Sequence, residues 1–129
     1  MKRLVSTDDA PAAVGAYSQA TTNGDLLFTA GQLPLTPEGD LLDDQSVAAQ
    51  TRQCLENVAA IAESEGLGLA DVLKTTIYLA DIEDFDEMNE TYAGFFEDEP
   101  PARSAVEVGN VPKGAALEVE AVIDASDDA

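Results

Sequence analysis

The side chains best suited to chemistry are an arginine and two glutamates in the last third of the chain. Arg103 follows a Pro-Pro-Ala sequence and begins a short apolar run. Its planar guanidinium can hold a carboxylate through two parallel hydrogen bonds, which a lysine ammonium does not reproduce. Glu118 and Glu120 lie two residues apart, so on a strand they share one face. They could place a carboxylate near Arg103 that holds or deprotonates a water molecule.

Each of these residues also has a purely structural interpretation. Arg103 could form an internal ion pair with a nearby glutamate, and the residues alone favour this alternative because structural ion pairs are common. The candidate partners are Glu107, Glu118 and Glu120. Acids at this spacing also occur often by chance in a chain with 26 acidic residues among 129.

The composition excludes several classes of enzyme. Histidine is absent and Cys54 is the single cysteine. These counts remove Ser-His-Asp triads, Cys-His dyads, histidine-ligated zinc or haem, and an internal disulfide. We therefore expect no metal and no cofactor, and a chemistry of carboxylates, arginine, hydroxyls, backbone groups and water.

The net charge indicates which partners and which ionic environment to expect. Six basic against 26 acidic residues give a net charge of −20, while 45% of residues are apolar, which predicts a folded core under an acidic surface. Nucleic acids and anionic membranes are bound mainly through clustered Lys and Arg, so we expect neither as a partner. The acids are scattered, which favours a halophilic source where salt screens their repulsion. The sequence contains no signal-peptide pattern and no 18-residue apolar run, so a cytoplasmic protein is expected.

The first half of the chain predicts three strands and a helix. We expect a strand at residues 3–6 and a hairpin at residues 17–31, because Asn23-Gly24 suits a type I′ turn. From about Ser46, apolar residues recur at helical spacing, with Cys54 on the apolar stripe and Gly66 as the stop. Gly31, at the expected strand end, could serve only the backbone or allow a ligand to approach closely.

The second half predicts a strand, a helix and two further strands. Alternation over residues 73–79 places Leu73 on the core face. In the helix that follows, Asp84 would be the N-cap with Glu87 completing a capping box. Asn89 lies on the aromatic face of that helix, where a buried amide bonded to backbone is the structural alternative to a ligand-binding role. Strands are expected at residues 103–108 and 117–123, and residues 124–129 are expected to fray.

This order of elements predicts a single α+β domain, a two-layer sandwich with two helices covering one face of a sheet. In the last two strands, alternation assigns one set of residues to the core: Ser104, Val106, Val108, Leu117, Val119, Ala121 and Ile123. The opposite face would then carry Arg103, Ala105, Glu107, Glu118 and Glu120. Such a face is either open to solvent or buried in an oligomer.

Seven sequence strings, in order from about Val5 to Ile123, resemble the RidA family, also called YjgF. They are APAAVGAYSQA (10–20), FTAGQLP (28–34), QTRQCLEN (50–57), DVLKTT (71–76), NETY (89–92), PARS (101–104) and LEVE (117–120). The resemblance implies a chorismate-mutase-like subunit with a mixed sheet, assembled as a homotrimer with three ligand sites between subunits. It also favours a functional Arg103 over an internal ion pair.

The resemblance further implies a deaminase of the 2-iminobutanoate/2-iminopropanoate type, which needs no cofactor. Such an enzyme hydrolyses reactive enamines and imines, such as 2-aminoacrylate, to 2-oxo acids and ammonia. Arg103 would clamp the substrate carboxylate and Glu118 would orient the attacking water. The remaining pocket residues would be Tyr17, Gly31, Asn89 and the backbone of Ala105.

The sequence departs from the family pattern at three positions. Ala16, Ala30 and Ala105 stand where the family commonly has proline, serine and cysteine. A hydroxyl or thiol role is therefore missing at the last two positions, while backbone contacts remain. The alternative function is a non-catalytic ligand-sensing or chaperone-like trimer of the same fold. RNA cleavage, which has been proposed for family members, is disfavoured by the charge.

Overall fold

Six strands and two helices follow the order expected from the sequence. The computed structural model describes residues 1–126. The elements are β1 (Arg3–Val5), β2 (Ala20–Thr22), β3 (Leu26–Thr29), α1 (Val47–Glu63), β4 (Val72–Leu79), α2 (Phe85–Phe95), β5 (Ala102–Glu107) and β6 (Leu117–Asp124). Short 3₁₀ turns precede β4, α2 and β6.

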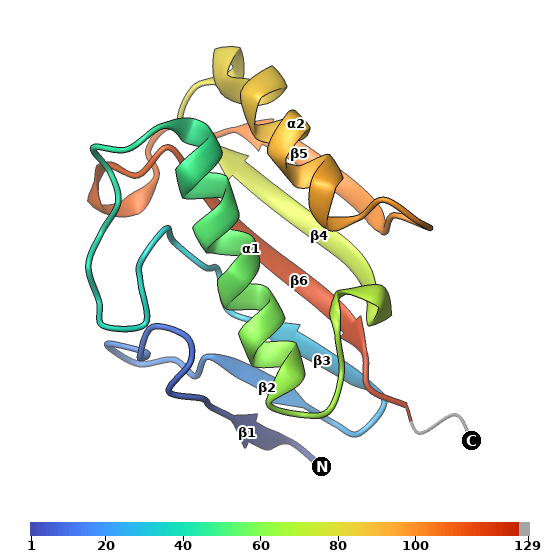
Figure 1. Cartoon of the computed structure of the whole chain (residues 1–129). Helices are drawn as coiled ribbons and strands as arrows, with labels where there is room; N and C mark the ends of the chain where they lie inside the picture. The colour runs from blue at the N-terminus through green and yellow to red at the C-terminus, as the bar shows by residue number, and fades with distance from the viewer. Residues whose placement is uncertain (127–129) are drawn as a thin grey trace.

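The strands form one mixed sheet in the order β1-β2-β3-β6-β4-β5. All neighbouring strands are antiparallel except β4 and β5, which are parallel. Parallel neighbours need a crossover connection, and α2 supplies it. Both helices lie on the same face of the sheet, with α2 above the β4–β5 end (Figure 1). The predicted α+β architecture with two helices on one face is confirmed.

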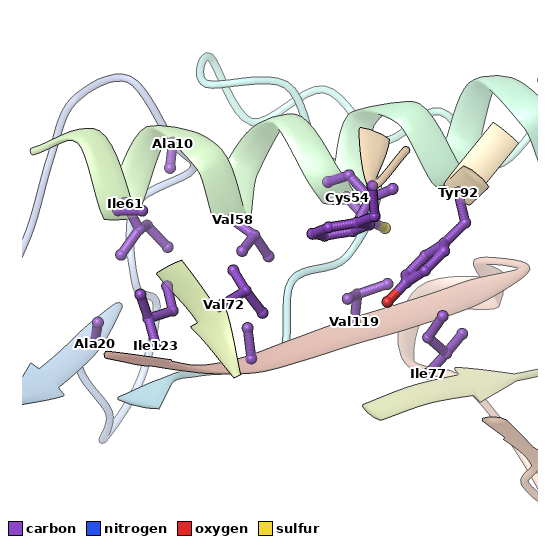
Figure 2. Close-up of a cluster of buried hydrophobic side chains, with 14 of the residues drawn as sticks. Ala10, Ala20, Cys54, Val58, Ile61, Val72, Ile77, Tyr92, Val119 and Ile123 are labelled. Carbon is purple, nitrogen blue, oxygen red and sulfur yellow. The ribbon is translucent and has the colours of Figure 1, made fainter. Parts of the chain in front are cut away.

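The core lies between α1 and the sheet. Side chains of α1, such as Val58 and Ile61, are fully buried against β6 residues such as Val119 and Ile123 (Figure 2). The helix begins after Ser46, whose Oγ accepts a hydrogen bond from the backbone N of Ala49 at 3.0 Å. Burial of these apolar side chains supplies the main stabilisation of the two-layer arrangement.

Cys54 is fully buried in this core, as its place on the apolar stripe predicts (Figure 2). Burial raises the pKa of its thiol far above the ordinary value. Gly66 follows the end of α1 with a φ of +74°, a conformation that favours glycine. The predicted stop signal is confirmed.

The predicted type I′ turn is wrong. That turn requires a positive φ at both central residues, but only Gly24 has one, at +97°. Instead, Oδ1 of Asn23 accepts hydrogen bonds from the backbone N of Asp25 and of Leu26, both at 3.0 Å. The asparagine side chain thus stabilises a wider turn between β2 and β3.

The expected core position of Leu73 is also wrong. A bulge between Val72 and Lys74 interrupts the pairing of β4 with β6. It shifts the alternation by one residue, so Val72 is buried while Leu73 is 49% exposed.

The predicted capping box of α2 does not form. A 3₁₀ turn (Ile82–Asp84) precedes the helix, and Asp81 caps that turn by accepting a hydrogen bond from the backbone N of Glu83. Asp84 makes no side-chain capping bond. The carboxylate of Glu87 accepts from the backbone N of Ala48 at 2.9 Å, so it ties α2 to the first turn of α1.

The predicted faces of β5 are inverted. Arg103 and Ala105 pair with Thr75 and Ile77 of β4, which are fully buried under the helices. Arg103 therefore lies on the helix-covered face of the sheet. Val106 is 44% exposed on the opposite face, which points away from both helices and is called the bare face below (Figure 1). Pairing with β4 decides which side chains point inward, and apolar alternation along β5 gives the opposite assignment.

The faces of β6 are as predicted. Residues Leu117, Val119, Ala121 and Ile123 are buried beneath the helices, while Glu118 and Glu120 lie on the bare face. The expectation that Arg103 shares a face with these glutamates is consequently wrong.

The strand β6 extends into the segment that was expected to fray. Asp124 is its last residue, and the backbone N of Ala125 donates to the carbonyl of Asp25 at 2.9 Å. Residues 127–129 of that expectation lie outside the described part of the chain. Among residues 1–126, no helix is both long enough and apolar enough to cross a membrane.

Candidate functional site

Arg103 lies on the edge strand β5 and its side chain packs against α2. Its Nη1 donates a hydrogen bond to Oδ1 of Asn89 at 2.6 Å. Its Cζ lies 4.8 Å from the ring centroid of Tyr92 and 5.4 Å from that of Phe85. Because Phe85, Asn89 and Tyr92 are spaced four and three residues apart, one face of α2 presents all three to the guanidinium.

Arg103 has no carboxylate partner among residues 1–126, where the ion pair found joins Arg3 and Glu65. The internal ion-pair alternative is therefore wrong for Arg103. The amide of Asn89 also bonds to a side chain, and within residues 1–126 it makes no bond to the backbone, which overturns the structural alternative for that residue. Aromatic faces attract a cation without neutralising it, so the guanidinium keeps its full charge for an external anion.

A groove of about 360 Å³ opens beside this guanidinium. The residues that line it are Asn89, Tyr92, Ala93, Phe96, Pro100, Pro101 and Arg103. Its walls are thus mostly aromatic and proline surface, and Arg103 is the charged group among them.

Tyr92 is a contact that the sequence interpretation missed. It is 4% exposed, and its hydroxyl lies 2.8 Å from Oγ1 of the fully buried Thr75. Figure 2 shows the ring reaching from the helix layer with its oxygen towards the sheet. Burial raises the pKa of the Tyr92 hydroxyl, so it is neutral at physiological pH. The spacing along α2 predicts an aromatic face that includes Asn89, but no spacing within α2 or β5 shows that this face meets Arg103.

Glu118 lies on the bare face of β6 and is partly buried. Partial desolvation raises the pKa of its carboxyl, and the neighbouring charge of Glu120 raises it further. Glu120 accepts a hydrogen bond from the hydroxyl of Tyr78 at 3.0 Å. A groove of about 290 Å³ borders the three side chains, and its other lining residues are Val108, Asn110, Val111 and Pro112.

Gly31 lies directly against Glu118. The bridge between Gln32 and Val119 brings the two segments together. A Cβ atom at position 31 would lie 2.6 Å from Cδ and 2.9 Å from Oε2 of Glu118, distances that real Cβ atoms do not tolerate. Glycine is therefore required here for a close approach, and not for its backbone angle.

Tyr17 lies on the same side as Gly31, because the two residues line one small cavity. The ring of Tyr17 is 53% exposed. Its hydroxyl oxygen accepts a hydrogen bond from the backbone N of Val14 at 3.3 Å. Tyr17, Gly31 and Glu118 thus form one group.

The six residues expected to form the site fall into two separate groups in one copy of the chain. The first contains Arg103, Asn89 and Ala105, and the second contains Tyr17, Gly31 and Glu118. The strand β4 separates β5 from β6, and pairing registers place Glu118 three residues along β6 from the position opposite Arg103. The two Cα atoms are therefore about 14 Å apart, with side chains on opposite faces. Among residues 1–126, no cluster of three or more His, Cys, Asp or Glu could hold a metal ion.

Comparison with known proteins agrees with the fold. The family model described as Endoribonuclease L-PSP matches residues 7–124. The 2-iminobutanoate/2-iminopropanoate deaminase of Escherichia coli K12 is 44% identical over 126 residues, covering 95% of this chain and 97% of the relative. A RutC family protein of Pyrococcus horikoshii is 47% identical over 122 residues, with coverage of 95% and 97%.

Solved structures match over nearly the whole chain. The crystal structure of the YjgF gene product of Escherichia coli superposes with a TM-score of 0.90 at 42% identity, covering 95% of this chain and 98% of that one. Escherichia coli TdcF with bound serine gives 0.90 at 38% identity, and RidA from an Antarctic Psychrobacter gives 0.89 at 40% identity, both with the same coverage. With matches of this extent in sequence and in structure, the chain belongs to the RidA (YjgF) family, whose family model is described as Endoribonuclease L-PSP.

Proposed function

We propose that this protein is a deaminase that hydrolyses small enamine and imine intermediates to 2-oxo acids and ammonia. The observation that carries the proposal is the unpaired charge of Arg103. In a chain of net charge −20, this guanidinium is held by one amide and two aromatic rings, and no acid within the described residues 1–126 pairs with it. An arginine kept free of carboxylates at an open groove is suited to bind the carboxylate of a small substrate.

Names of relatives support this substrate class. One relative is named 2-iminobutanoate/2-iminopropanoate deaminase, and a related structure, TdcF, is described with bound serine. Both names denote small molecules with a carboxylate and a nitrogen on the neighbouring carbon. A small anion also fits this chain better than RNA, because a net charge of −20 repels phosphates.

The chemistry asks little of the protein. The enamine CH₂=C(NH₂)–COO⁻ takes up a proton at carbon and becomes the iminium CH₃–C(=NH₂⁺)–COO⁻, which is already electrophilic. Water adds to the iminium carbon while a base removes one proton from the water. The resulting carbinolamine receives a proton on nitrogen. The C–N bond then breaks and expels ammonia, while the hydroxyl group gives its proton to the base and becomes the C=O group of the 2-oxo acid.

Glu118 is the group proposed for the proton transfers. As a carboxylate it accepts the proton from the attacking water, and as the acid formed it returns that proton to the leaving nitrogen. Its raised pKa, caused by partial burial and by Glu120, brings the pKa closer to operating pH and makes both transfers easier. Gly31 holds the carboxylate by allowing direct contact, while Tyr17 and the backbone of Ala105 complete the pocket wall.

We propose further that each site is completed by two copies of the chain in a homotrimer. Within one copy, Arg103 and Glu118 lie on opposite faces of the sheet, too far apart to act on one small molecule. The bare face carries exposed apolar side chains, among them Leu4, Phe28 and Val106, which is typical of a surface that packs against another subunit. One copy would supply Arg103, Asn89 and Ala105, and its neighbour Tyr17, Gly31 and Glu118.

Mixing two inactive variants tests both proposals. Arg103→Ala and Glu118→Ala are each expected to abolish most of the acceleration of pyruvate release when a serine dehydratase generates 2-aminoacrylate in the assay. Co-refolded together, each mixed trimer regains one site with both groups. Random mixing should therefore restore roughly a quarter of the parent activity.

The outcomes separate the alternatives. No recovery on mixing, with both variants trimeric and folded, would contradict a site shared between copies. Full activity of Arg103→Ala alone would contradict the role of Arg103 as the clamp for the substrate carboxylate. A Glu118→Ala protein that still accelerates hydrolysis would contradict the proposed role of Glu118. A parent protein that binds 2-oxobutanoate without accelerating hydrolysis would favour the non-catalytic binding alternative.

We also infer a saline cytoplasm as the setting of this protein, because the excess of 20 negative charges repels itself at low ionic strength and is screened at high salt. The melting temperature should rise with KCl concentration up to the molar range. A maximum of stability at low salt would contradict the inference.

A further inference from the structure

The contacts of Arg103 are not equally fixed. Asn89 and Phe85 are both partly exposed, and within the described part of the chain no hydrogen bond beyond that to Arg103 anchors the Asn89 side chain. Tyr92 differs because it is buried and because both ends of its side chain are held. Its hydroxyl pairs with Thr75, and its ring packs on Phe96 with centroids 4.7 Å apart.

The residue that pairs with the Tyr92 hydroxyl also neighbours Arg103 in the sheet. Thr75 of β4 is the direct strand neighbour of Arg103 of β5. The three residues therefore contact one another in a closed set. Arg103 pairs with Thr75 across the strands, the hydroxyl of Thr75 pairs with that of Tyr92, and the Tyr92 ring centroid lies 4.8 Å from Cζ of Arg103. These contacts together fix the position of the guanidinium relative to β5, the strand that carries it.

Core packing alone does not account for this hydroxyl pair. A phenylalanine at position 92 and a valine at position 75 would fill the same space without bringing two polar groups into the core, which costs free energy unless both are paired. A hydrogen bond that fixes the ring has a purpose only if another group depends on the position of the ring. The group in contact with that ring is Arg103.

We propose that Tyr92 and Thr75 are positioning residues for Arg103, with their hydroxyl pair holding the ring that aims the guanidinium at the substrate carboxylate. This inference rests on the proposed function, since it presumes that Arg103 binds the carboxylate. It adds two residues that do not touch substrate and act through the arginine.

The test measures binding of 2-oxobutanoate, a product analogue with the required carboxylate, by calorimetry on the intact assembly. Tyr92→Phe and Thr75→Val each remove one hydroxyl of the pair and keep the volume. Each is expected to raise Kd by about three- to tenfold. The double variant should bind no worse than the weaker single variant, because the two hydroxyls act as one unit. Thr75→Ser, which keeps a hydroxyl, should restore binding to within about twofold.

Thr22→Val is the matched control. Thr22 is also a buried threonine whose hydroxyl donates a hydrogen bond, to the carbonyl of Leu26 at 2.8 Å, but it lies on β2 at the other end of the sheet. It should lose stability and bind 2-oxobutanoate like the parent. If Tyr92→Phe and Thr75→Val behave in the same way, the hydroxyl pair is merely structural and the inference is overturned.

A second measurement needs no variant. A guanidinium fixed by its contacts rotates slowly, so the Nη protons of Arg103 should give separate NMR signals, while those of exposed Arg52 should be averaged. Averaged Nη signals for Arg103 would overturn the inference.

Arg103→Ala distinguishes failure of the proposed function from failure of the positioning role. Unchanged 2-oxobutanoate binding in that variant refutes the proposed function itself. Lost binding in Arg103→Ala with normal binding in Tyr92→Phe refutes only the positioning role.

Discussion

Arg103 and Glu118 carry opposite charges, yet each is held by groups that do not neutralise it. On the helix-covered face, a cation is held by an amide and aromatic rings, and no acid of the described chain pairs with it. On the bare face, an acid lies against a glycine and beside a second acid, and burial disfavours its charge. Neither charge has a counter-charge in contact among residues 1–126 of its own copy. Placed on one face of one sheet, the two groups would pair and neutralise each other, so their separation keeps both available for a substrate.

The largest expected effect comes from removing the acid while keeping the cation. Glu118→Ala should lower kcat by roughly 10²–10⁴-fold, the usual contribution of a positioned proton-transfer group. Binding of 2-oxobutanoate should change little, because the carboxylate site at Arg103 is intact. Calorimetry and the coupled dehydratase assay measure the two properties separately. Glu56→Ala, which removes an exposed acid from α1, is the control and should change neither.

A smaller loss is expected from displacing the acid without removing it. In Gly31→Ala the added methyl group would overlap the Glu118 carboxyl, and displacement of a catalytic group by about 1 Å costs up to roughly 10²-fold in rate. Adding Gly31→Ala to Glu118→Ala should cause no further loss. Gly94→Ala is the matched control, since a Cβ atom there meets no neighbour within 4 Å. Full activity of Gly31→Ala would show that the position of Glu118 is unimportant.

The pH dependence tests the electrostatic half of the comparison. Glu120 raises the pKa of Glu118, so Glu120→Gln should move the acid limb of the kcat/KM profile to lower pH. The limb should stay above the ordinary glutamate range of about 4.3, because desolvation, the larger cause, remains. Glu107→Gln, a change on the helix-covered face, should leave the limb in place. An unmoved limb in Glu120→Gln would assign the titration to another group.

The smallest expected effect is on stability. A carboxyl whose pKa is raised by folding stabilises the folded state below its unfolded pKa and loses that contribution as pH rises through the folded pKa. At neutral pH the ionised Glu118 is therefore a cost, and Glu118→Gln should raise Tm by on the order of 1–3 °C. The gain should vanish below about pH 4, where both states of the parent are protonated. A gain that persists unchanged at low pH would point to packing instead.

The fold could be predicted from the sequence because its signals are local and consistent. Helical spacing and the Ser46 and Gly66 boundaries placed α1, and the alternation of β6 assigned its two faces correctly. The identities of the site residues came from the resemblance to a family, and alternation alone gave Arg103 the wrong face.

The errors arise where pairing with a distant segment overrides local pattern. The apolar side chain of Val106 suggested an inward position, but pairing with β4 turns it outward. A bulge in β4 turns Leu73 outward in the same way. The contact between Arg103 and Tyr92 depends on how α2 crosses over β5, which no spacing within either segment encodes.

The burial of Cys54 has a practical consequence. Thiol reagents attack exposed thiolates, and this thiol is both fully buried and held in its neutral form. The folded protein therefore behaves towards such reagents as though it contained no cysteine. A cysteine introduced at Val14, which is 83% exposed, would be its single reactive thiol. Spin labels attached there could count the copies in the assembly and measure the distances between them, with no second substitution needed.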